Sequence, residues 1–216
     1  MEFIDLEILK NISLLIAIWV AIYGIDSWRR SHIGTRQIEL AEETLALFYE
    51  ASDAIKHIRH PLGYSNETEE IVRNKNETEA QFEARKKASV VFHRYNKNQE
   101  LFNKIHASRY RFMAQISKEK AKPFEELHNL LMEIIIAARM LSRLWPAEDN
   151  HRTPEQSEKH RKKIEKYESV FWDGAEDEDP INPKLEKIIL DIEDICQDII
   201  SGKGTLHGVL NIKFWK

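Results

Sequence analysis

The sequence has little of the residues that break helices or cross-link a chain. Its 216 residues include one cysteine, seven glycines and six prolines. A single cysteine, Cys196, excludes an internal disulfide framework and fits a reducing compartment. The sequence also contains no phosphate-binding loop, dinucleotide fingerprint, nucleophile elbow or zinc-type cysteine pair. We therefore expect no catalytic activity, no cofactor and no bound metal.

The chain also has no excess of positive charge. Its net charge is −4 at pH 7, so no overall basic field favours nucleic acid as a partner. Charged residues make up 31% and hydrophobic residues 42% of the chain, which excludes a disordered tail and a multi-span transporter. The length allows one ordinary domain together with an anchor.

One stretch carries no charge at all. It is residues 12–25, ISLLIAIWVAIYGI, with Ser13 as its only strongly polar side chain. A membrane-spanning helix needs roughly 20 mostly apolar residues, so the span requires flanking residues such as Leu9 and Trp28 to complete it. We interpret residues 1–30 as a membrane anchor helix. A buried core helix and an interfacial helix are the alternatives, and apolar residues on every side of the helix argue against the interfacial one.

The charges that flank this stretch predict its orientation. Arg29, Arg30 and Arg36 follow it, whereas three acidic residues accompany Lys10 on the other side. The positive-inside rule then places the C-terminal side in the cytoplasm and the N-terminus outside. The acidic N-terminal region also argues against a cleaved signal peptide.

Small residues recur along the anchor. Ser13, Ala17 and Ala21 lie four residues apart, and Gly24 continues the strip one residue early. Strips of this kind let two membrane helices approach closely. They predict homo-oligomers, and the alternative is a strip that simply faces lipid.

The rest of the chain has helical periodicity. The helix that includes the anchor is expected to continue to His60–Pro61, and residues 77–117 are expected to form one long helix with Asn98 and Arg109 in its apolar stripe. Further helices are predicted over 123–145, from a capping box at Thr153 to Gly174, and over 182–201. Loops are expected at 61–76, 146–153 and 174–182, the last of them acidic, with a tail at 202–216. The predicted fold is all-α: one N-terminal transmembrane helix (1–30) running into an antiparallel cytosolic bundle (31–216) of about four to five helices.

Two charged residues lie on or near apolar stripes. Arg109 and Glu133 are almost equally distant from the link near Lys120, so an antiparallel hairpin places them at one level. Each needs a partner if it is buried, which predicts a buried ion pair that fixes helix register. The alternative is that both side chains reach solvent at the edge of the stripe.

The helix over 77–117 also carries a candidate basic surface. It would contain Arg85, Lys86, Lys87, Arg94, Lys97, Lys104 and Arg111. Such a surface suits anionic lipid or nucleic acid, but we favour a solvated face, or one neutralised by the acidic run 175–179 and the acids of the last helix. The spacing Glu125-x-x-His128 matches half of a di-metal site, and the other half is missing.

These features predict a membrane-anchored helical scaffold or sensor that binds a protein partner. The alternative is a self-assembling membrane effector whose anchor helices oligomerise and perturb or perforate the bilayer. An enzyme comes third, and would require a deep pocket around Arg109, His128 and Glu133.

Overall fold

The structure is a computed structural model that describes residues 2–63, 67–146, 153–175 and 179–202, with the backbone alone for residues 2–9. Helix makes up 83% of the structure, and the described residues contain six α-helices and no strand. The predicted all-α class is therefore confirmed. The predicted tail, 202–216, lies almost wholly outside the described residues.

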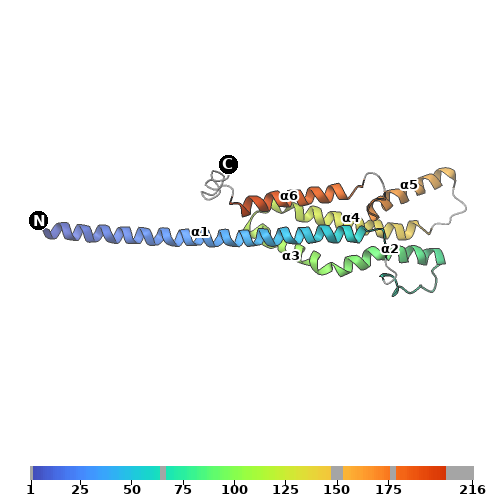
Figure 1. Cartoon of the computed structure of the whole chain (residues 1–216), viewed down its shortest axis with the longest axis horizontal. Helices are drawn as coiled ribbons and strands as arrows, with labels where there is room; N and C mark the ends of the chain where they lie inside the picture. The colour runs from blue at the N-terminus through green and yellow to red at the C-terminus, as the bar shows by residue number, and fades with distance from the viewer. Residues whose placement is uncertain (1, 64–66, 147–152, 176–178, 203–216) are drawn as a thin grey trace.

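The first helix, α1 (Glu2–Arg59), dominates the architecture. It runs for 58 residues, or about 87 Å at 1.5 Å per residue, and Gly34 does not interrupt it. Its N-terminal part projects alone from the molecule, whereas its C-terminal part lies among the other helices (Figure 1). It ends just before Pro61, which has no amide hydrogen and disfavours helix in the residue before it.

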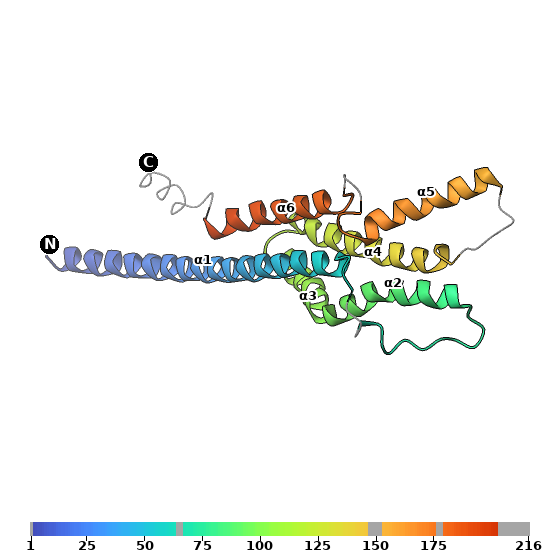
Figure 2. The same ribbon diagram turned by 45° about the vertical axis from the view of Figure 1, so that its right-hand side comes forward.

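Five further helices complete the bundle: α2 (Glu79–Lys97), α3 (Gln99–Gln115), α4 (Lys122–Leu144), α5 (Pro154–Phe171) and α6 (Asn182–Ile200). The central element is α4. Near the projecting end of the molecule it lies with α1, α3 and α6, and towards the far end it lies with α2 and α5 (Figures 1 and 2). The C-terminal end of α1 therefore lies partway along the bundle, between these two groups of helices.

The core follows from the apolar face of α4. Leu127, Ile134 and Leu141 of this helix are almost fully buried. Phe124 packs edge-on against Phe48 of α1, with ring centroids 5.0 Å apart. The helix predicted over 123–145 is thus the central element of the bundle, and the aromatic contact of Phe124 joins it directly to α1.

The prediction of one continuous helix over residues 77–117 is wrong. Residues 77–117 form α2 and α3 rather than a single helix, and the break is at Asn98. The Asn98 side-chain amide donates to the carbonyl oxygen of Arg94 at 2.9 Å, in competition with the backbone. The capping box predicted at Thr153 is present, and a second one at Thr78 starts α2.

Candidate functional site

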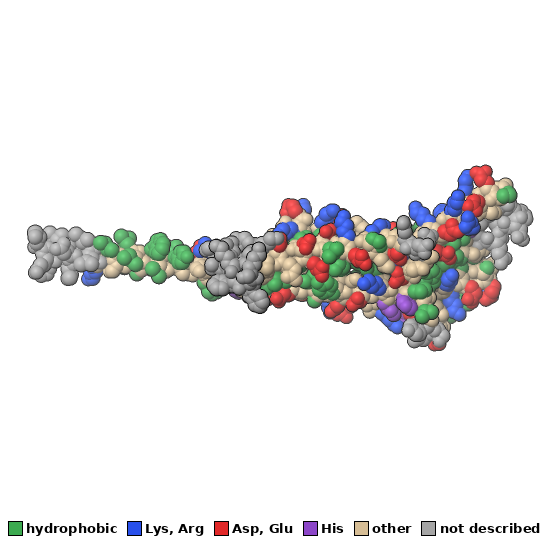
Figure 3. Space-filling view, turned by 45° about the horizontal axis from the view of Figure 1, so that its top comes forward, with side chains coloured by type: hydrophobic (Ala, Val, Ile, Leu, Met, Phe, Trp, Pro, Cys, Tyr) green, Lys and Arg blue, Asp and Glu red, His purple; other side chains and the backbone are tan. Residues whose placement is uncertain are grey.

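The apolar stretch of α1 is exposed on every side. Leu15, Trp19 and Ile25 each expose about two thirds of their surface. The most apolar 18-residue window of the helix has a mean hydropathy of 1.4 and buries none of its residues. Figure 3 shows apolar side chains on this projecting part, while charged side chains cover the bundle. By length and composition, α1 is able to cross a membrane, and no described part of the chain packs over the stretch as it would over a core helix.

The strip of small residues lies on this projecting part. The Ser13 hydroxyl donates to the carbonyl oxygen of Lys10 at 2.8 Å, so it is satisfied within the helix. Ala17 and Ala21 are exposed, and a Cβ atom added at Gly24 would meet nothing within 4 Å. The described part of the chain does not use this strip, and helix packing through it stays a prediction.

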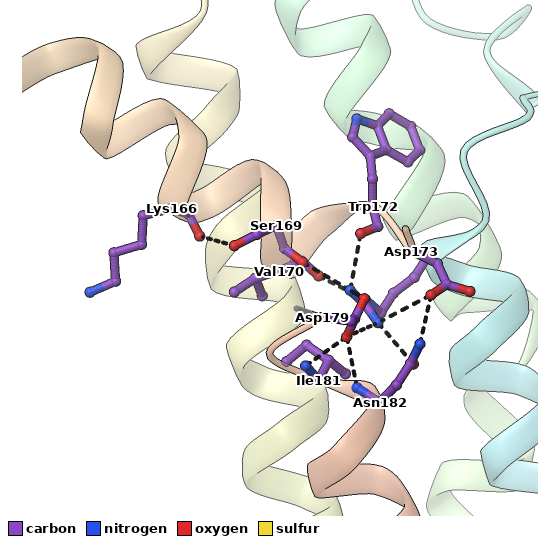
Figure 4. A network of polar contacts seen from close by, with 9 residues as sticks. Lys166, Ser169, Val170, Trp172, Asp173, Asp179, Ile181 and Asn182 are labelled. Carbon is purple, nitrogen blue, oxygen red and sulfur yellow. Dashed lines mark hydrogen bonds and ion pairs between the residues drawn. The ribbon is translucent and has the colours of Figure 1, made fainter. Parts of the chain in front are cut away.

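The first helix, α1, ends at a buried arginine that the sequence analysis did not predict. Arg59 is the last residue of α1, and its side chain is fully buried. Its Nε donates to the carbonyl oxygen of Val170 at 2.9 Å, and its Nη2 donates to those of Ser169 and Trp172 at 2.9 and 3.0 Å (Figure 4). These carbonyl groups lie at the C-terminus of α5, where a helix leaves acceptors without intrahelical partners. Arg59, the last residue of α1, therefore caps the C-terminus of α5.

The same guanidinium group binds Asp179 through two parallel hydrogen bonds of 3.0 and 2.7 Å. Asp179 Oδ1 also accepts the backbone N–H groups of Ile181 and Asn182 at 2.8 and 2.7 Å, at the start of α6. Burial opposes ionisation of Asp179, but the hydrogen bonds from Arg59 and from these two amides lower its pKa below the usual value. We call the contacts among Arg59, Asp179, Asn182 and the C-terminus of α5 the Arg59 junction. It holds three helix ends together.

A second buried arginine caps α1 itself. Arg94 of α2 donates to the carbonyl oxygens of His57 and His60 at 3.0 and 2.6 Å, and forms two hydrogen bonds with Glu67 at 2.7 and 3.0 Å. Its side chain is 1% exposed. The prediction that Arg94 belongs to a basic surface is therefore wrong.

Three of the other six residues of the predicted basic surface pair with acids. Arg85 pairs with Glu77 at 2.7 Å, and this hydrogen bond, with one from the Asn74 amide, lowers the pKa of Glu77 to about 2. Lys104 pairs with Glu100 at 3.0 Å, and Arg111 pairs with Glu43 at 3.2 Å. Lys87 lies over the ring of Trp145. Lys86 and Lys97 form no salt bridge with a described residue. The acids in these pairs do not belong to the run 175–179 that was predicted to neutralise the surface, and most of that run lies outside the described residues.

The predicted pair of Arg109 with Glu133 is also wrong. Arg109 contacts Glu125 at 3.4 Å, whereas Glu133 binds Lys184 of α6 at 2.8 Å. Eight residues separate the two glutamates, which turns them about 80° apart around α4. The link between α3 and α4 also contains a 3₁₀ turn, Glu119–Ala121, so equal counting from Lys120 does not give the register.

A cavity of about 190 Å³ brings Arg109 and His128 together, but Glu133 does not line it. Within the described residues, no group of three or more His, Cys, Asp or Glu side chains is arranged to hold a metal ion. No protein family, curated protein or solved structure matches the chain.

Proposed function

We propose that the protein is a single-pass membrane scaffold or sensor without catalytic activity, whose cytoplasmic bundle binds a protein partner. The N-terminus lies outside in this proposal. One observation carries it: a single helix is an exposed apolar rod over residues 12–25 and a buried element of the bundle from Leu40 to Arg59. The anchor is thus part of the folded domain and not a tether attached to it.

This continuity supports a role in transmission. A helix without a break passes a shift or rotation along its axis to its far end, and α1 ends at Arg59. The Arg59 junction connects that end to the C-terminus of α5 and the start of α6. Movement of the anchor in the bilayer would therefore displace α5 and α6 relative to α4, which is a form of helix shift that proteins use in switching.

A groove on the bundle suits a partner. Two neighbouring cavities of about 290 and 420 Å³ share Asn129 and Glu133, and lie where α4 meets α6 and α5. Ile136 lines the second cavity and exposes 52% of its surface although it is a large apolar residue. Apolar surface patches with a polar rim are typical of protein interaction sites, and here Ile136 lies in a groove rimmed by Glu133, Lys166 and Lys184. The groove lies between the two helices that the Arg59 junction positions.

Photo-crosslinking from this groove tests the proposal. A photoreactive residue at Ile136 of the full-length protein, in its native membrane, is expected to give an adduct with a distinct protein. The matched control replaces Asn103 with the photoreactive residue, because Asn103 is exposed on α3 and lies outside the groove. Equal labelling from both positions, or none from Ile136, would contradict a partner site here.

The membrane effector is the second candidate, because the small-residue strip lies free on a lone apolar helix. The two roles differ in liposomes loaded with a fluorescent dye. A scaffold leaves the dye inside after reconstitution of the full-length protein. Dye release that the double substitution Ala17→Leu and Ala21→Leu abolishes would support the effector and contradict the scaffold.

A further inference from the structure

The cavity between α3 and α4 has a chemistry that the scaffold role does not use. Its volume is about 190 Å³. An enclosed apolar cavity of about 150 Å³ is large enough to bind benzene. This cavity therefore has room for one aromatic ring or a short alkyl chain with a polar group attached.

The walls of the cavity are apolar. They comprise Phe102 and Ile105 of α3 with Phe124, Leu127 and Leu131 of α4. All but Phe102 are at most 5% exposed, so they form the inner surface. A ligand body that fits here must be apolar, because the inner surface offers no side-chain hydrogen-bonding group.

The polar lining contains one permanent cation, Arg109, and two histidines, and no acid lines the cavity. His106, Arg109 and His128 complete the cavity, and all three are more exposed than its inner wall, so they mark its mouth. The described acid nearest to the guanidinium of Arg109 is Glu125, which is 60% exposed. The mouth thus favours an anionic group on the ligand.

The guanidinium of Arg109 is incompletely satisfied by the described residues. Its Nε is buried and makes no hydrogen bond with a described residue, and its Nη2 reaches Glu125 only at 3.4 Å. A donor left without an acceptor in a buried position is costly, and a guanidinium group is built to bind a carboxylate through two parallel hydrogen bonds. An incoming carboxylate would supply the missing acceptors.

We propose that this cavity binds a small monocarboxylate with an apolar body, of the aryl or short alkyl class. The carboxylate binds the guanidinium of Arg109 at the mouth, and the apolar body lies between Phe102 and Phe124. This inference goes beyond the proposed function and does not depend on it, because it concerns α3 and α4 alone.

The test uses 4-fluorobenzoate as the probe and the full-length protein in phosphatidylcholine nanodiscs. Fluorine NMR is expected to show saturable binding, and 4-fluorobenzyl alcohol is expected to bind more weakly. Arg109→Gln should weaken 4-fluorobenzoate binding roughly ten-fold or more, since hydrogen bonds to a charged group are lost. Arg111→Gln is the control: Arg111 lies on the same helix, outside the cavity, and its replacement should leave affinity unchanged.

A second variant keeps the test independent of Arg109's effect on folding. Glu125 is 60% exposed, so Glu125→Gln retains the fold while removing the carboxylate that competes for Arg109. We expect it to tighten 4-fluorobenzoate binding. Absence of saturable binding to the parent protein would mean that the cavity holds water only. That result, equal affinity of parent and Arg109→Gln, or unchanged or weaker binding to Glu125→Gln, would overturn the proposal.

Discussion

Arg94 caps the helix that ends in Arg59, and Arg59 in turn caps α5. The Arg94 Nη1 donates to the carbonyl oxygen of His57, in the last turn of α1, at 3.0 Å, while the Arg59 Nη2 donates to that of Ser169 at 2.9 Å. Two buried guanidinium groups thus connect α2 to α1 and α1 to α5 in series. The end of α1 is therefore held by contacts with both α2 and α5.

Loss of the Arg59 side chain should destabilise the bundle strongly. Arg59→Met leaves Asp179 without its cation and leaves the terminal carbonyl groups of α5 without donors. Removal of one partner from a buried ion pair typically costs about 3–5 kcal/mol. Chemical denaturation of the full-length protein, followed by circular dichroism, measures this loss. Arg73→Met is the matched control, because Arg73 forms an exposed pair with Glu79, and pairs of that kind contribute only about 0–1 kcal/mol.

The stabilisation from Asp179 should depend on pH in a defined direction. Its pKa is lowered in the folded protein, whereas an unfolded Asp has a pKa of about 3.9. The stabilisation is therefore fully present well above pH 4, and is lost as the pH falls through the folded pKa. We expect Asp179→Asn to be less stable than the parent by a constant amount between about pH 5 and 7, with the difference shrinking below about pH 4. A difference that grows towards low pH would contradict the Arg59–Asp179 pair.

Glu133→Gln should have almost no effect on stability. The pair of Glu133 with Lys184 is exposed, with 41% and 52% of the two side chains accessible. Such pairs contribute about 0–1 kcal/mol. A thermal melt that matches the parent protein is the expected result, while a loss of several kcal/mol would restore the buried role that the sequence pattern predicts.

Cys196 should resist thiol reagents in the folded protein. Its side chain is fully buried in α6, and burial raises the pKa of its thiol to about 11. Because the thiolate is the reactive form, labelling with a chromogenic disulfide at pH 7 is expected to be slow. Labelling should become fast in denaturant. Rapid labelling of the native protein would show that the face of α6 that carries Cys196 is open to solvent, and would contradict its burial.

The sequence predicts the positions of the helices more accurately than the polar contacts between them. The apolar period and the prolines predicted most helix ends, because these depend on local chemistry. The Arg59 junction depends on a distant loop that brings Asp179 to the end of α1, and a single sequence does not encode that encounter in any visible pattern. One signal was available: Arg59 follows Ile55 by four residues and Arg94 follows Val91 by three, so both arginines continue buried stripes.

The Arg109–Glu133 prediction failed for a related reason. Equal counting from a link assumes a tight antiparallel hairpin, but the 3₁₀ turn at Glu119–Ala121 changes the register. The side chain of Arg109 then lies near Glu125, two turns before Glu133. A count of residues predicts axial level only when the geometry of the connection is known.

A distance measurement tests whether α1 runs without a break from its exposed apolar stretch into the bundle. Spin labels at Val20→Cys and Glu50→Cys, both exposed positions on α1, are separated by about 45 Å along a continuous helix. Buried Cys196 should stay unlabelled, and dilution with unlabelled protein suppresses distances between neighbouring molecules. Double electron–electron resonance on the full-length protein in nanodiscs should give one narrow distribution near 45 Å. A broad distribution, or one centred well below that distance, would show a hinge between anchor and bundle and contradict the account.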